Sequence, residues 1–342
     1  MVLAARLIVL GSLNMDISVT VPALPAPGAT VLGGAALIAP GGKGANQAVA
    51  AARLGRGAGL AVRMVGCVGD DDFGRTLRAA LRAEGIDDSA VRAVPGAPTG
   101  IAMITVDAAG ENTITVAPGA NRQVGAADVA AARDLADVLV ISAEIPGPAI
   151  RTALASAGPA SAPSARTIRL LNLAPVPADA AGLIAAGPDW LVVNESEAAA
   201  ILGRPVAGLA AAARGAADLV TAGAGSAVVT AGAAGAAYCG PRVARDGPAL
   251  PEGGAEFAVI TVPGFTVHAV DSVGAGDTFT GALAVAVAAG VPPVEAVTAA
   301  AAAGATAAAR PGTQSGMPYP ADILAVTGHS WPVRGWSGTQ TQ

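Results

Sequence analysis

Apolar residues recur along this chain at two spacings, one typical of strands and one of helices. Helix-like spacing predicts helices at 45–54, 73–84, 275–289 and 294–309. Short apolar runs between turn residues predict buried strands at 7–10, 61–65, 138–141, 168–173, 191–193 and 219–221. Because strands and helices alternate from residue 138 onward, we expect βαβ units in an α/β domain. Its sheet would be mostly parallel, with helices on both faces.

Two predicted strand pairs break this alternation. Strands at 17–21 and 30–38 flank a Pro- and Gly-rich segment, and strands at 101–106 and 113–116 flank a hairpin signal. We expect them to form a small antiparallel β-sheet lid, discontinuous in sequence at about 12–40 and 97–118, over the carboxyl ends of the parallel strands.

The remaining boundaries follow from composition. A second hairpin is expected from strands at 227–230 and 236–239. Segments 156–166 and 240–254 are rich in small residues and proline, so we expect surface loops there. The main domain is expected to span 1–327, followed by a polar C-terminal tail at 328–342.

Composition and charge exclude several classes of protein. Hydrophobic residues make up 53% of the chain but aromatic residues only 3%, and the uncharged stretch 278–294 holds two prolines, so we expect no membrane span. No basic signal-peptide region opens the chain, and we expect a cytoplasmic protein. The net charge is −5 with no basic stripe, which argues against nucleic-acid binding. Two isolated cysteines and two separated histidines argue against a disulfide framework, a zinc site and a Ser-His-Asp triad.

The strongest chemical signal is the segment 271–282, DSVGAGDTFTGA. Its small residues lead directly into a helix, whose free backbone N–H groups and dipole favour an anion. Asp277 lies in the first turn, where a bound phosphate would repel its carboxylate. Accepting a proton from an attacking hydroxyl would explain that placement. The alternative is an acidic residue that only stabilises the helix.

A second glycine-rich segment, GGKGAN at 41–46, also precedes a helix. Its spacing matches neither a Walker A loop nor a dinucleotide fingerprint. Lys43 and Asn46 offer donors that suit sugar hydroxyls. Lys43 is the single lysine among 20 basic residues, so either a ligand contact or arginine-rich composition explains it.

Polar residues at three other predicted strand ends are further candidates. Asn14 and Asp16 follow the first strand, and the carboxylate of Asp16 can accept from two vicinal hydroxyls; a capped turn is the alternative. The sequence NESE at 194–197 could hold Mg²⁺ through waters or simply begin a helix. The turn TAGAGS at 221–226 could wrap a nucleotide or only join two elements.

In this order, from about Arg6 to Tyr319, the motifs resemble the ribokinase (phosphofructokinase-B-type) carbohydrate kinase family. The resemblance implies a Rossmann-like α/β domain with a β-sheet lid. It further implies ATP-dependent phosphorylation of D-ribose at O5, giving D-ribose 5-phosphate and ADP. It also implies Mg²⁺ with ATP and a monovalent cation, usually K⁺, as activator. Since an exposed sheet edge is a liability, we further expect a homodimer that pairs through the lid.

The resemblance assigns roles by position. Asp277 would be the catalytic base, and the anion hole would be formed by Gly274, Ala275 and Gly276. The sugar would contact Asn14, Asp16, Gly42, Lys43, Asn46, Glu144 and Asp277. ATP would contact Asn194, Thr221, Ala222, Gly223, Ala224, Gly225, Ser226, Gly276 and Asp277, and Glu197 would reach Mg²⁺ through water. The monovalent cation would be held by Asp271, Val273, Ala307, Arg310, Gly312 and Gly316, mostly through carbonyls.

Two departures from the family pattern concern the nucleotide. Ser226 stands where the family's turn usually has a second glycine, and the segment 240–254 is longer than expected. Three other functions stay open: a kinase of fructose, deoxyribose or a pyrimidine nucleoside, a non-catalytic sugar-binding protein, and an NAD-dependent oxidoreductase. The last is disfavoured because the dinucleotide fingerprint is missing.

Overall fold

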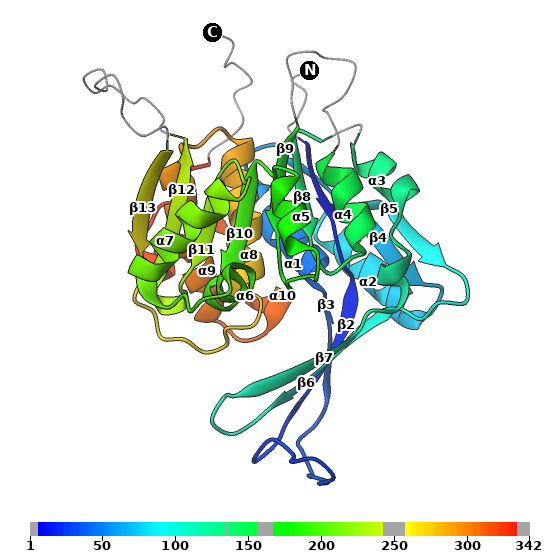
Figure 1. Cartoon of the computed structure of the whole chain (residues 1–342). Helices are drawn as coiled ribbons and strands as arrows, with labels where there is room; N and C mark the ends of the chain where they lie inside the picture. The colour runs from blue at the N-terminus through cyan, green and yellow to red at the C-terminus, as the bar shows by residue number, and fades with distance from the viewer. Residues whose placement is uncertain (1–5, 134–135, 156–166, 242–256, 334–342) are drawn as a thin grey trace, which may run out of the picture.

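The computed structural model describes residues 6–133, 136–155, 167–241 and 257–333 (Figure 1). Its main sheet has nine strands in the order β13-β12-β11-β10-β9-β8-β1-β4-β5. Their bounds are β1 Arg6–Leu10, β4 Ala61–Gly69, β5 Asp87–Val94, β8 Val138–Ser142, β9 Ile168–Asn172, β10 Trp190–Asn194, β11 Ala227–Thr230, β12 Gly235–Pro241 and β13 Phe257–Pro263. Strands β5 to β11 in this order are parallel, and β12 and β13 extend the sheet by antiparallel pairing.

Helices cover both faces of this sheet, which confirms the predicted α/β class. One face carries α1 Lys43–Gly55, α2 Asp72–Ala83, α8 Ala275–Ala288, α9 Pro293–Ala308 and α11 Pro320–Thr327. The other carries α3 Ala126–Arg133, α4 Gly147–Leu154, α5 Ala180–Ala185, α6 Glu195–Leu202 and α7 Gly208–Thr221. Strand β1 serves both cores, because Leu7 and Val9 pack on the first side and Ile8 and Leu10 on the second. No helix in the described ranges is long and apolar enough to cross a membrane.

A second sheet projects from the body, as Figure 1 shows. It has the order β3-β2-β6-β7, and its strands are β2 Asn14–Thr20, β3 Leu37–Gly41, β6 Gly100–Val106 and β7 Asn112–Ala117. The lid is therefore present, but it is not wholly antiparallel. Its central strands β2 and β6 pair in parallel, since both leave the body side by side, with Asn14 opposite Gly100.

The structure overturns two strand predictions. Most of 30–38 has no regular structure and is exposed, and only its last two residues belong to β3. Gly33 and Gly34 lie against the end of β2, where the Gly34 N–H donates to the Thr20 carbonyl at 2.8 Å. The run 219–221 is the last turn of α7, because Leu219 continues the buried face of that helix.

Other differences concern strands and segments outside the predicted set. Strands β5 and β13 were not predicted. They are the two outermost strands of the nine-stranded sheet, and both are partly exposed. The predicted loop 156–166 lies outside the described residues. So does 240–254, apart from Gly240 and Pro241, which end β12. Of the predicted tail, only 328–333 is described.

The chain order creates one crevice at the carboxyl edge of the sheet. From β1 the chain proceeds to β4 and β5 on one side, and it later enters β8 on the other side of β1. Connections that leave neighbouring strands in opposite directions open a space between them, and ligands of α/β proteins bind there. The lid strand β2 begins beside the end of β1, so the lid lies over this space.

Candidate active site

The glycine-rich loop before α1 lies directly against the end of β1. Gly42 has φ 89°, and a Cβ there would stand 2.6 Å from the Asn14 nitrogen. A Cβ on Gly44 would stand 2.6 Å from the Ser12 nitrogen. Glycine is therefore required by close backbone approach at both positions and also by left-handed φ at Gly42. The result is that Lys43, the first residue of α1, is held beside the crevice.

Glu144 joins three of these segments. It follows β8, and its Oε2 accepts from the Ser12 hydroxyl at 2.6 Å, from Asn14 Nδ2 at 3.4 Å and from the Lys43 backbone N–H at 3.4 Å. The Asn14 amide is oriented from its other side, because its Oδ1 accepts from Asn121 Nδ2 at 2.8 Å. The polar residues expected at the ends of β1 and β8 thus form one hydrogen-bonded group.

The charges in this crevice perturb one another. Burial, with Glu144 and Asp277 nearby, raises the pKa of Asp16 to about 7, although Lys43 opposes the shift. The pKa of Lys43 is raised, chiefly by Asp277 and against the effect of burial, with Glu144, Glu197 and Asp16 adding to it. A single cation therefore stands among four carboxylates. Charged groups that perturb one another within a crevice are typical of a functional site, and carboxylates can accept hydrogen bonds from hydroxyl groups.

Asp277 is held by two amides from α1. It is 8% exposed in the first turn of α8; its Oδ2 accepts from Asn46 Nδ2 at 2.9 Å and its Oδ1 from Gln47 Nε2 at 3.1 Å. Gln47 also donates to Asn172 Oδ1 at 3.0 Å, at the end of β9. Sequence reasoning missed Gln47 and Asn172, although each is a polar residue at the end of an element that points to the crevice.

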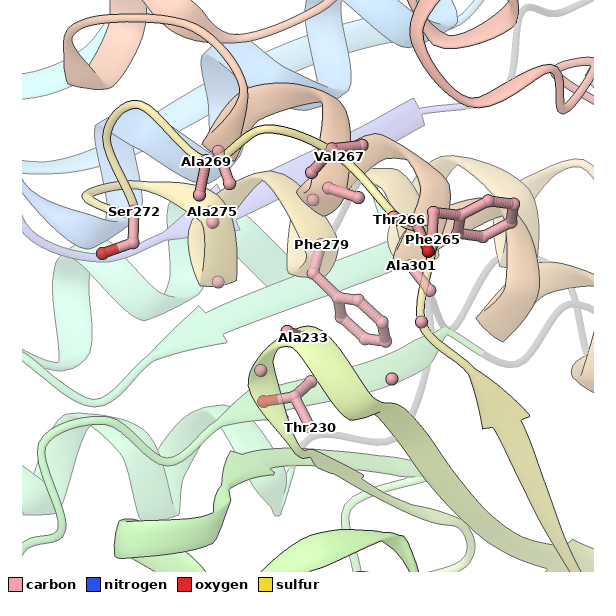
Figure 2. A pocket seen from close by; sticks show the side chains of 17 residues that line it. Thr230, Ala233, Phe265, Thr266, Val267, Ala269, Ser272, Ala275, Phe279 and Ala301 are labelled. Carbon is pink, nitrogen blue, oxygen red and sulfur yellow. The ribbon is translucent and has the colours of Figure 1, made fainter.

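An apolar pocket of about 510 Å³ lies on the other side of Asp277 (Figure 2). The turn between β11 and β12, the segment 264–272, the start of α8 and one face of α9 enclose it. Figure 2 shows Phe279 pointing from α8 towards Thr230 and Ala233 of the turn. The lining continues through Ser272, Ala275 and Gly276, which directly precedes Asp277. The pocket and the polar crevice therefore adjoin at Gly276 and Asp277.

The turn that lines this pocket is not the one expected from sequence. Thr230 ends β11, and residues 230–235 read TAGAAG, with Gly232 and Gly235 at the spacing expected after Thr221. Gly235 has φ 114°, and a Cβ there would stand 2.1 Å from the Val262 carbonyl oxygen, so glycine is required.

The turn predicted to contact the nucleotide lies at the amino ends of the parallel strands, opposite to the crevice. Thr221, Ala222, Gly223, Ala224, Gly225 and Ser226 join the end of α7 to the start of β11. The Gly225 N–H donates to the Pro188 carbonyl, just before β10. Residues that precede a parallel strand lie at its amino edge, whereas Asn194 and Thr230 end β10 and β11 at the carboxyl edge. The assignment of this turn to ATP is therefore wrong, and so is the departure inferred at Ser226.

Asn194 and Glu197 begin α6 as a capping box. The Asn194 side chain accepts from the Glu197 N–H, and the Glu197 carboxylate accepts from the Asn194 N–H, each at 2.8 Å. The pKa of Glu197 is raised, chiefly by burial, while the hydrogen bond from the Asn194 N–H and the charge of Lys43 oppose the shift. The helix-start interpretation thus describes the local structure, while the influence of Lys43 shows that this carboxylate shares the electrostatic environment of the crevice.

The residues assigned to a monovalent cation gather behind the start of α8. Asp271 accepts from the Val273 N–H through Oδ1 and from the Gly312 N–H through Oδ2, each at 3.0 Å. A Cβ on Gly316 would stand 3.2–3.6 Å from the carbonyl oxygens of Arg310, Pro311 and Ala307. Backbone carbonyl oxygens are ligands that K⁺ takes in proteins, so the donor chemistry of this loop fits K⁺ or a similar cation.

Comparison with known proteins decides the family. The family model described as pfkB family carbohydrate kinase matches residues 4–320. The chain belongs to the pfkB carbohydrate kinase family. The chain is thus a carbohydrate kinase of this family, which confirms the resemblance found in the sequence.

Individual relatives of this kinase agree over nearly its whole length. The ribokinase of Schizosaccharomyces pombe is 34% identical over 94% of this chain and 97% of its own, and that of Haemophilus influenzae is 33% identical over 95% and 99%. A deoxyribokinase of Salmonella typhi is 32% identical over 81% of this chain and 83% of its own. Among solved structures, Arabidopsis thaliana ribokinase complexed with ribose and ATP aligns with a TM-score of 0.77 at 27% identity, covering 96% of this chain and all of that one.

Proposed function

We propose that this carbohydrate kinase transfers the terminal phosphoryl group of ATP to O5 of D-ribose, giving D-ribose 5-phosphate and ADP. The observation that carries the proposal is the position of Asp277. Its carboxylate lies at the N-terminus of α8, with the polar crevice on one side and the apolar pocket on the other. The identity to ribokinases over nearly the whole chain supports ribose as the sugar.

The polar crevice suits a small polyol. Asn14, Asp16, Lys43, Asn46 and Glu144 would supply a mixture of donors and acceptors there, and the close packing of Gly42 against Asn14 would hold the loop beside the sugar. The carboxylate of Asp16 can accept from a vicinal diol, which the lid would cover. Such hydrogen-bonded recognition discriminates strongly against an analogue that lacks one hydroxyl.

The apolar pocket suits the base of a nucleotide, with Phe265 and Phe279 among its lining residues. The turn 230–235 and the N-terminus of α8 then face the phosphates. During transfer Asp277 takes the proton from O5, the bond from O5 to phosphorus forms, and the bond from phosphorus to the ADP oxygen breaks. The N-terminus of α8, with Gly274, Ala275 and Gly276, would stabilise the charge on the transferring group, with the Ala275 N–H shared with the Ser272 carbonyl at 3.2 Å, and Lys43 would add a positive charge.

Two cations belong to the proposal. Among the described residues no cluster of three or more His, Cys, Asp or Glu side chains could bind a metal, so Mg²⁺ would arrive with ATP. Glu197 would hold it through water, and Asn194 would lie near the phosphates. The loop around Asp271, Val273, Ala307, Arg310, Gly312 and Gly316 would hold K⁺ or a similar cation.

The lid would also join two copies of the chain. Its surface exposes several apolar side chains: Leu37 at 61%, Ile38 at 55%, Met103 at 61% and Ile114 at 49%. Exposed apolar positions on a small sheet favour pairing with a second sheet of the same kind. We therefore propose a homodimer, and a monomeric mass by light scattering at micromolar concentration would refute it. We also propose a cytoplasmic location, where ATP is available.

A sugar panel tests the function. ADP release is coupled to a spectroscopic assay with ribose, 2-deoxyribose, fructose and a pyrimidine nucleoside, each with and without K⁺. Ribose should give the highest kcat/KM, and K⁺ should raise it. If another substrate were phosphorylated much faster, the assignment of ribose would fail. Ribose binding by calorimetry without any ADP release would instead indicate a sugar-binding protein without catalysis.

A further inference from the structure

Asn46 contacts a residue that none of the sequence motifs included. Its Nδ2 donates to Asp277, and its Oδ1 accepts from Gln314 Nε2 at 3.0 Å. Gln314 lies in the short helix α10, Thr313–Gly316, within the loop that carries Gly312 and Gly316. A continuous line of hydrogen bonds therefore runs from this loop through Asn46 to the base.

The direction of this donation matters because the two ends of an amide are not equivalent. One end of the Asn46 side chain is an acceptor and the other a donor. As long as Gln314 donates to Oδ1, Nδ2 must face Asp277 and can donate to the carboxylate. If Gln314 is removed, the Asn46 amide can rotate and place its oxygen against the carboxylate of Asp277, which would repel it.

The backbone of Gln314 is fixed to the same helix that carries Asn46. Arg53 of α1 donates to the Gln314 carbonyl at 2.7 Å and to the Met317 carbonyl at 2.8 Å, while its other guanidinium nitrogens bond Glu84. The loop also reaches the anion hole, because a Cβ on Gly274 would stand 2.8 Å from Thr313 Cγ2. The backbone of Gln314 is thus held by α1, so its side chain starts from a fixed position when it reaches Asn46.

We propose that Gln314 is a positioning residue for the phosphoryl-transfer step: it fixes the Asn46 amide so that Asn46 donates to Asp277. The proposal rests on the proposed function, in which Asp277 is the base. It assigns to the 310–316 loop a direct hydrogen-bonded connection to the reacting groups, in addition to its carbonyl oxygens.

Three variants separate this role from a merely structural one. Gln314→Met keeps the length of the side chain but removes the donor, and Gln314→Glu keeps the shape but replaces the donor by an acceptor. Turnover should fall in the order Gln, Met, Glu, by about tenfold for Met, as for the loss of one buried hydrogen bond, with little change in KM for ATP. If Gln314 had only a structural role, the isosteric variant Gln314→Glu should turn over faster than Gln314→Met. Gln123→Met, at an exposed position, is the matched control and should behave as the wild type.

A double-mutant cycle tests whether Gln314 acts through Asn46. In the Asn46→Ala background, Gln314→Met should change kcat by less than about twofold, since the residue it acts on is gone. Ribose affinity measured by calorimetry without ATP should fall in the same order, because a rotated Asn46 amide would also lose its proposed contact with the sugar. Thermal unfolding checks that each variant is folded. The proposal is overturned if Gln314→Glu matches the wild type, or if Gln314→Met removes further activity when Asn46 is absent. If no sugar in the panel is turned over, the proposed function fails, and the order of ribose affinities alone decides on Gln314.

Discussion

The polar crevice and the apolar pocket, the two halves of the proposed substrate cleft, are lined by different kinds of groups. The half that we propose for the sugar, the sugar half, is made of side chains, with Asp16, Lys43 and Glu144 joined to their neighbours by hydrogen bonds and charge. The half that we propose for the nucleotide, the nucleotide half, is made largely of backbone and apolar surface, with five glycines and alanines from the turn at 230–235 and the start of α8 among its lining. The first half should therefore be sensitive to changes in chemistry, and the second to changes in volume.

Asp277 belongs to both halves, so its substitution should have the largest effect. Asp277→Asn keeps the shape but cannot accept the proton of O5. We expect kcat to fall by about 10² or more, within the range for loss of a general base, while ribose affinity stays nearly intact. Coupled ADP release and calorimetry measure the two quantities. Near-normal turnover would remove Asp277 from the role of base.

Asp16→Asn should damage the sugar half alone. Loss of charged hydrogen bonds to the diol should lower kcat/KM for ribose about 30-fold, with KM for ATP unchanged. In the wild type, ribose affinity should rise with pH towards and through about 7, the pKa to which burial and neighbouring carboxylates raise Asp16, because the ionised form accepts both hydroxyls. If Asp16→Asn showed the same pH dependence, another group would be responsible.

The same substitution should stabilise the free protein. Because the pKa of Asp16 is higher in the folded state than its ordinary value of 3.8, its ionisation opposes folding increasingly between about pH 4 and pH 7. Asp16→Asn should therefore unfold at a higher temperature than the wild type at pH 8, by about 2 °C or more, and the difference should vanish near pH 4. An equal midpoint at pH 8 would contradict the buried charge.

Lys43→Arg changes geometry and keeps the charge. A planar guanidinium is larger than an ammonium, and Lys43 stands among Asp16, Glu144, Glu197 and Asp277. We expect a loss of about tenfold in kcat/KM, comparable to one misplaced charged hydrogen bond. Full activity in this variant would mean that arginine-rich composition alone accounts for the single lysine.

Gly276→Ala probes volume in the nucleotide half. A Cβ at Gly276 meets no atom within 4 Å, so the protein should tolerate it, and alanine in a helix should even stabilise it slightly. The methyl group would nevertheless occupy the space offered to the phosphates, and KM for ATP should rise severalfold. Gly57→Ala, where a Cβ also meets nothing within 4 Å, is the matched control and should leave KM unchanged.

The smallest effect should distinguish the two small-residue turns. Thr230→Val removes a hydroxyl from the pocket lining and should raise KM for ATP about twofold, a fraction of one hydrogen bond. Thr221→Val, at the opposite edge of the sheet, should change neither kinetic constant. A larger effect at Thr221 than at Thr230 would restore the assignment that the structure overturned.

These two turns show what the local sequence pattern can predict and what it cannot. TAGAGS at 221–226 and TAGAAG at 230–235 differ in two positions and lie three residues apart. The element before each turn decides its place, because a turn after a strand lies at the carboxyl edge and a turn after a helix at the amino edge. Leu219 and Val220 suit either a strand or a buried helix face, so local pattern could not choose between them.

The amides around the base illustrate a second limit. Asn46 and Asp277 could be predicted as site residues because each stands in a glycine-rich segment at a helix start. Gln47, Asn172 and Gln314 carry no such signal, since a polar residue in a helix or at a strand end is common. Their partners lie up to 268 positions away in the chain, and only packing of α1 against α8 and the loop near α10 reveals them.

Sequence patterns were sufficient to predict the α/β class and the lid, and the motif resemblance predicted the kinase family and most residues of the polar crevice. Strand and helix periodicity and glycine-rich segments are local properties, and the residues of the crevice lie within a few positions of them. Tertiary structure alone decided which turn faces the nucleotide pocket, how Glu144 joins the sugar half, and how Gln314 reaches Asp277 through Asn46. These depend on the edge at which each segment emerges and on contacts between distant segments, which local periodicity does not encode.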